Sequence, residues 1–128
     1  MDKPRIRPAI AADVPAIAKI VDHAYRHYIA RMGKPPGPML EDYAARVSEG
    51  VVWVLEEGAV IAAIIVLLPG VNHLLLDNIA VSPNHQGLGL GRRLLAFAET
   101  EALRRGEIRL YTHQTMVENQ RPLRFNRL

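Results

Sequence analysis

The stretch that decides the fold is residues 74–81, LLLDNIAV, followed by Ser82-Pro83 and then by residues 85–95, HQGLGLGRRLL. An apolar run before a Ser-Pro break predicts a strand, and the three glycines predict a loop that leads into a leucine-rich helix. Glycines at 87, 89 and 91 allow several backbone N–H groups to converge on one anion, and the start of a helix adds unpaired amides and the positive end of its dipole. The stretch therefore predicts a strand–loop–helix unit that binds a diphosphate.

The spacing of the glycines narrows the class of ligand. It is Gly-x-Gly-x-Gly, whereas dinucleotide folds use Gly-x-Gly-x-x-Gly, and no Gly-Lys-Ser/Thr follows, as a nucleoside triphosphate loop requires. Both common nucleotide folds are therefore disfavoured. A glycine-rich segment of this length is also compatible with a purely structural turn.

Two segments carry a resemblance to a known family. Residues 78–83, NIAVSP, followed by Gln86-x-x-Gly89-x-Gly91, resemble the acetyl-CoA signature of the GNAT superfamily of N-acetyltransferases, in which the pattern is Gln/Arg-x-x-Gly-x-Gly/Ala. The resemblance is to bacterial members and runs over nearly the whole chain. It implies one domain over residues 1–128, with a mixed, mostly antiparallel central sheet and helices on both faces. It also implies acetyl transfer from acetyl-CoA to a primary amine, by direct attack in a ternary complex and without a metal.

The resemblance assigns the cofactor contacts mainly to the backbone. The pantetheine arm is expected at the end of the fourth strand, the diphosphate on the loop amides, and a further contact at the start of the last helix. The residues implied are Ile79, Ala80, Val81, Gln86, Gly87, Leu88, Gly89, Leu90, Gly91, Arg92 and Asn119.

The remaining pattern predicts alternating strands and helices. Asp13 is expected to cap a first helix, a second helix is expected from residue 39 or 40 to Ser48, and the third begins at about Gly89. Pro69-Gly70 is expected to break the sheet between two strands. The predicted strands are residues 5–7, 51–55, 60–68, 74–81 and 108–112, the last of them parallel to the fourth after a right-handed crossover.

Composition limits the class of protein. With 128 residues, 49% hydrophobic and 23% charged, the chain is expected to form one globular domain. There is no cysteine, no signal-peptide pattern, and no apolar stretch approaching about 20 residues, so a cytoplasmic protein without a membrane span is expected. A net charge of +3 suits an anionic ligand, and the arginines lack the interleaved aromatics of a nucleic-acid module.

An acetyltransferase needs a base that removes a proton from the acceptor ammonium. Asp77 is the first candidate, because it lies in an otherwise apolar strand where loss of hydration strengthens a carboxylate as a base. A hydrogen-bonded acid with a structural role is an equally good interpretation of Asp77. His73 and His113 are weaker alternatives, because each lies near a predicted strand end and imidazole titrates in the useful range.

The resemblance places the acceptor pocket between the first two helices, which points to Tyr28 and Arg31, whereas Tyr25 is expected in the core. The acceptor amine is left open between a small molecule and a protein N-terminus or lysine. Phe125 stands where many relatives carry a tyrosine that protonates the leaving thiolate.

The family's C-terminal strands are also expected to be missing. The edge at residues 108–112 is then expected to pair with a second copy as a homodimer. A catalytically impaired CoA-binding or regulatory module is the alternative function.

Overall fold

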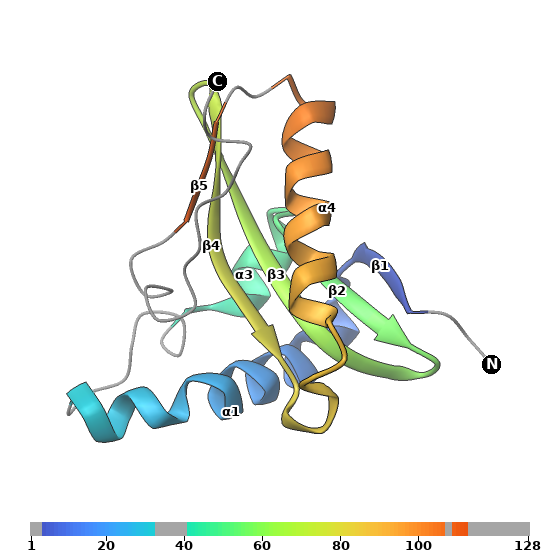
Figure 1. Cartoon of the computed structure of the whole chain (residues 1–128), viewed down its shortest axis with the longest axis vertical. Helices are drawn as coiled ribbons and strands as arrows, with labels where there is room; N and C mark the ends of the chain where they lie inside the picture. The colour runs from blue at the N-terminus through green and yellow to red at the C-terminus, as the bar shows by residue number, and fades with distance from the viewer. Residues whose placement is uncertain (1–3, 33–40, 107–108, 113–128) are drawn as a thin grey trace.

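The computed structural model describes residues 4–32, 41–106 and 109–112. Its centre is a five-stranded sheet in the order β1-β2-β3-β4-β5 (Figure 1). The first four strands are antiparallel neighbours and β5 is parallel to β4, which confirms the mixed, mostly antiparallel sheet. The strands are β1 (Arg5–Pro8), β2 (Val52–Glu57), β3 (Val60–Gly70), β4 (His73–Val81) and β5 (Arg109–Thr112).

Helices cover both faces of the sheet (Figure 1). α1 (Val14–Met32) and α3 (Tyr43–Ser48) pack on one face, and α4 (Leu90–Arg104) packs on the other. On the α4 face, Trp53 of β2 lies against Phe97 with ring centroids 5.6 Å apart. Because β3 lies under helices on both sides, all of Ala62–Leu67 is fully buried. This explains why that strand is a continuous apolar run rather than an alternating one.

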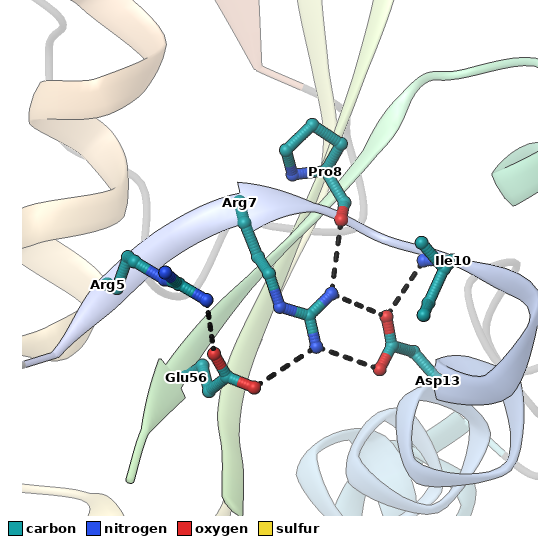
Figure 2. A network of polar contacts seen from close by, with 6 residues as sticks. All are labelled: Arg5, Arg7, Pro8, Ile10, Asp13 and Glu56. Atoms are coloured by element: carbon teal, nitrogen blue, oxygen red, sulfur yellow. Dashed lines mark hydrogen bonds and ion pairs between the residues drawn. The ribbon is translucent and has the colours of Figure 1, made fainter. Parts of the chain in front are cut away.

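The start of α1 differs from the sequence expectation. A short 3-10 turn, η1 (Ala11–Asp13), precedes the helix, and the Asp13 carboxylate accepts a hydrogen bond from Ile10 N–H at 2.8 Å instead of capping the first turn of α1. Figure 2 shows the cause: Arg7 of β1 binds both Asp13 oxygens, at 2.9 and 3.1 Å, and also contacts Glu56 of β2 at 3.3 Å. The charge-assisted pair outcompetes the cap because it satisfies both carboxylate oxygens.

This ion pair ties the first strand to the first helix. The Arg7 guanidinium lowers the pKa of the Asp13 carboxyl below its ordinary value, chiefly through the hydrogen bonds between them. Asp13 is 7% exposed, so its charge is shielded from water and held by that one partner and by the Ile10 amide. The network fixes the angle at which α1 leaves the sheet.

Two other boundaries also differ from expectation. The second helix, α3, begins only at Tyr43, because the Asp42 carboxylate accepts from Ala45 N–H at 3.1 Å and caps it there; residues 39–40 lie outside the part that the structure describes. β3 continues through Pro69-Gly70, and the chain reverses at the next two residues, where Asn72 takes a φ of 60°. Asparagine tolerates this left-handed conformation, so it takes over the role expected of Gly70.

Candidate functional site

The glycine-rich segment forms the predicted loop between β4 and α4. It follows a short 3-10 turn, η2 (Pro83–His85), and Gly87 and Gly89 take φ angles of 84° and 78°. Gly89 is the N-cap of α4, and the Arg93 N–H donates to the Gly89 carbonyl at 3.1 Å as the first turn closes. The amides of the residues before Arg93 in this turn have no acceptor within the helix, so they are available to an anion at the positive end of the helix dipole.

The loop requires glycine for its backbone conformation and leaves space above it. A Cβ atom built at Gly87 or Gly89 meets no atom within 4 Å, so neighbouring protein groups do not fill the space that these glycines leave. A side chain there is strained by the positive φ alone. At Gly91, by contrast, a Cβ would touch Val81 Cγ2 at 3.9 Å, an ordinary contact that places the first turn of α4 against the end of β4. This arrangement fits a diphosphate group.

The end of β4 presents backbone groups toward the side on which β5 lies. The Ser82 N–H donates to the Ala62 carbonyl at 2.8 Å, which defines a hydrogen-bonded pair between the ends of β3 and β4. Hydrogen-bonded and non-hydrogen-bonded pairs alternate along an antiparallel ladder, so Ile79 and Val81 occupy non-hydrogen-bonded pairs with β3. Their N–H and C=O groups therefore point away from β3.

β5 does not reach these residues within the part of the chain that the structure describes. Its last residue, Thr112, pairs with Leu76, and β4 runs on past it toward the glycine loop (Figure 1). The Gln86 side chain lies against this edge, with Nε2 3.5 Å from the Val81 carbonyl oxygen. The outward backbone groups of Ile79 and Val81 thus lie directly before the glycine loop, at the positions where the sequence predicts pantetheine and diphosphate.

Asp77, the predicted base, is the extra residue of a β-bulge. Val66 pairs with Asn78 and the next residue, Leu67, pairs with Leu76, so the register of β3 with β4 skips Asp77. The residue is half-buried. A bulge locally re-aims a strand and its side chains, and bulges are common beside active sites.

A buried polar cluster lies directly beside the bulge. The Asn78 side chain is 1% exposed; its Oδ1 accepts from the Tyr25 hydroxyl at 2.7 Å, and its Nδ2 donates to the Tyr43 hydroxyl oxygen at 2.7 Å. Tyr25 also lies 3.2 Å from the Ile79 carbonyl oxygen. Tyr25 comes from α1 and Tyr43 is the first residue of α3, so the cluster joins both helices to β4.

The hydroxyl of Tyr43 keeps its proton at neutral pH. Burial raises its pKa above the ordinary tyrosine value, and the charge of nearby Asp77 adds to the increase. The carboxylate at the bulge and the tyrosine cluster therefore share one electrostatic environment on the α1 and α3 side of the sheet.

The other predicted site residues are distributed unevenly. His73 is the first residue of β4, and its Nδ1 lies 3.0 Å from the Val71 carbonyl oxygen. At about 3.3 Å per residue, the two ends of this 9-residue strand lie roughly 26 Å apart, so the structure does not bring His73 to the glycine loop. Tyr28 and Arg31 belong to the last turns of α1, but their side chains lie outside the described part, as do His113 and Asn119.

The basic residues that follow the glycines separate in the structure. Arg92 and Arg93 are both exposed, and Arg93 Nη2 lies 3.4 Å from the Pro4 carbonyl oxygen, beside the start of β1.

Within residues 4–32, 41–106 and 109–112, no group of three or more His, Asp or Glu side chains is placed to hold a metal ion. No helix in those same ranges is long and apolar enough to cross a membrane.

The chain is a mixed α/β domain in which a glycine loop leads from β4 into the N-terminus of α4. The sequence profile of the Acetyltransferase (GNAT) family matches residues 16–127, and the chain belongs to that family. Comparison with curated protein sequences finds no match to this chain.

Solved structures support the same assignment. The chain is 26% identical to the ribosomal-protein-S18-alanine N-acetyltransferase of Escherichia coli, with a TM-score of 0.68 over 86% of this chain and 66% of that chain. It is also 26% identical to yncA, a putative acetyltransferase of Salmonella typhimurium solved with its cofactor acetyl-CoA, with a TM-score of 0.67 over 87% and 69%. The PaiA N-acetyltransferase of Thermoplasma acidophilum, in complex with coenzyme A, shares the fold at 16% identity and a TM-score of 0.72, over 88% and 81%. The chain thus spans about two thirds of the length of the Escherichia coli enzyme.

The sequence reasoning missed the bulge and the role of Asn78. A signal was present: an amide in the middle of an apolar strand has to find hydrogen-bond partners once it is buried. Tyr25, which was expected in the core, is indeed 4% exposed, and Tyr43 is 6% exposed. These two hydroxyls are the partners that the buried amide required.

Proposed function

We propose that this protein transfers an acetyl group from acetyl-CoA to a primary amine. Membership of the GNAT family supports acetyl transfer in general, and a related structure holds acetyl-CoA. The observation that carries the proposal is that the backbone groups of Ile79 and Val81 point away from β3 directly before the loop in which Gly87 and Gly89 take positive φ angles. This arrangement offers donors to an extended amide-bearing arm and to a diphosphate at the same time.

The proposed reaction is a direct transfer. Asp77 accepts a proton from the acceptor ammonium, directly or through one water molecule. The neutral nitrogen then attacks the thioester carbonyl carbon, a C–N bond forms, and the C–S bond breaks as CoA leaves as a thiolate. The nitrogen loses its remaining extra proton as it becomes an amide, and the thiolate takes up a proton to give CoA. Asp77 suits the role because the bulge sets it apart from the β3 register beside the expected pantetheine edge. His73 is a weaker candidate, because it lies at the opposite end of β4.

The acceptor belongs to the class of primary amines, and the family places its pocket near the end of α1 that carries Tyr28 and Arg31. The Escherichia coli relative is an alanine N-acetyltransferase for a ribosomal protein. A peptide with an N-terminal alanine is therefore the first acceptor to test, followed by a lysine peptide and by small amines.

Calorimetric titration with acetyl-CoA, followed by detection of released thiol with this amine panel, tests the proposal. We expect 1:1 binding and thiol release that depends on the amine. Binding without release for any amine would favour the alternative, a CoA-binding module that has lost catalysis. Absence of binding by folded protein would refute both functions, because ligand at 100 times its Kd should stabilise the fold by about 2.7 kcal/mol.

Assembly and location remain predictions from the sequence. We propose a homodimer formed through the edge of β5 and a cytoplasmic protein that binds neither nucleic acid nor membranes. Light scattering of the purified chain tests the dimer directly, and a monomer at micromolar concentration would refute it.

A further inference from the structure

The polar cluster at Asn78 does more than satisfy a buried amide. The Tyr25 hydroxyl lies within hydrogen-bonding distance of two acceptors, Asn78 Oδ1 at 2.7 Å and the Ile79 carbonyl oxygen at 3.2 Å. A hydroxyl carries one proton, so the two acceptors share it, and the Tyr25 oxygen lies between the Asn78 side chain and the Ile79 backbone, closer to the side chain. Tyr25 thereby links α1 to a backbone group of β4 itself.

The backbone group that Tyr25 contacts belongs to the part of β4 that runs past its pairing with β5. Ile79 lies in a non-hydrogen-bonded pair with Ile65, so its carbonyl is not used by β3. The edge follows the bulge at Asp77, where the ladder is interrupted and a strand is free to bend and twist. The N–H of Ile79 points to the same side of the strand as its carbonyl, so a partner that holds this carbonyl also helps to keep that N–H in one direction.

We propose that Tyr25 is a positioning residue for acetyl-CoA, which holds the Ile79 carbonyl and thereby keeps the N–H of the same residue directed at the pantetheine arm. This inference rests on the proposed function, because it assumes that the arm lies along β4. Tyr25 itself stays on the α1 side of the sheet, at 4% exposure, and acts through the residue that it holds.

The cluster supplies a matched control. Tyr43 also bonds Asn78, through Nδ2 at 2.7 Å, and it is as deeply buried as Tyr25. Of the two tyrosines, Tyr25 is the one with a hydrogen bond to Ile79 among the residues that the structure describes. Removing either hydroxyl takes one hydrogen-bond partner from Asn78, but only Tyr25→Phe also removes the hydrogen bond to the Ile79 carbonyl.

The experiment compares two ligands on three proteins. CoA carries the pantetheine arm, and adenosine 3′,5′-bisphosphate carries nucleotide phosphates without it. We expect Tyr25→Phe to weaken CoA binding about 3- to 10-fold, the range for loss of one hydrogen bond, while bisphosphate binding stays the same. Tyr43→Phe should lower the melting temperature but leave the affinity for both ligands unchanged.

Each alternative outcome has a separate meaning. If the wild type binds neither ligand, the proposed function fails. If the wild type binds CoA and Tyr25→Phe binds it equally well, the positioning role is wrong. Equal losses for both ligands, or equal losses for both variants, would mean that the cluster only stabilises the fold, which also overturns the inference.

A measurement on the wild type covers the case in which Tyr25→Phe does not fold. Nuclear magnetic resonance of the labelled protein follows the carbonyl carbon of Ile79 and the ring of Tyr25 as CoA is added. Both resonances are expected to shift together and to saturate at the same ligand concentration. A Tyr25 ring that does not respond while Ile79 does would overturn the inference.

Discussion

Two alanine substitutions in the glycine loop should have opposite effects, although they lie only two positions apart. Gly89 has a φ of 78°, and a Cβ there meets nothing within 4 Å, so Gly89→Ala costs only the strain of the left-handed conformation, about 1–2 kcal/mol. Gly91 lies in the first turn of α4, where a Cβ makes an ordinary 3.9 Å contact with Val81. Because alanine is the better helix former, Gly91→Ala should stabilise the protein by up to about 1 kcal/mol.

Urea unfolding of the two variants and the wild type measures this difference. One kcal/mol corresponds to a shift in melting temperature of roughly 4 °C for a domain of this size, so thermal unfolding also resolves the two variants. Gly91→Ala should keep its CoA affinity, whereas Gly89→Ala weakens binding and Gly89→Glu abolishes it through steric block and charge repulsion. A Gly89→Ala protein as stable as the wild type would refute the left-handed conformation. A loss of more than 1 kcal/mol in Gly91→Ala would refute the spacing between α4 and β4.

Three further changes test other parts of the structure. Asp77→Asn should lower kcat by about 10²- to 10⁴-fold while leaving acetyl-CoA affinity intact; an unchanged kcat would remove Asp77 as the base, and Glu49→Gln, at the exposed C-cap of α3, serves as the control. Asp13→Asn should cost about 1–3 kcal/mol at pH 7 in urea unfolding. Because Arg7 lowers the pKa of Asp13, the ion pair contributes fully to stability above the ordinary aspartate pKa, and this contribution is lost as the pH falls through the lowered pKa. The unfolding free energies of wild type and variant should therefore converge in acid. A difference that stays constant with pH would contradict the pairing. Leu94→Ala, at a fully buried position on the α4 face, should cost about 2–5 kcal/mol, and a loss under 1 kcal/mol would contradict that packing.

The sequence predicted those parts of the fold that local chemistry determines. The glycines at 87 and 89, the continuous apolar run of β3 and the amphipathic pattern of α4 each lead to one structure, and each was confirmed. Asp13 was misassigned because an N-cap is a local signal, whereas its actual partner, Arg7, lies on another element. Capping was the correct principle, but a charged partner brought close by the fold provides the stronger interaction.

The bulge at Asp77 shows why the site itself was harder to predict. In a regular strand, Asn78 would share a face with Leu74 and Leu76, which pack against α4, and its amide would enter an apolar core without partners. The extra residue shifts the alternation by one position, so that Ile79 and Val81 turn toward α4 while Asn78 and Ala80 turn toward α1. Burial of one amide thus favours the bulge, and the bulge sets Asp77 apart from the ladder, next to the part of β4 that runs past β5. The cause is the hydrogen bonding of Asn78 to Tyr25 and Tyr43, which lie 53 and 35 positions before it in the sequence. No local sequence pattern contains this relation.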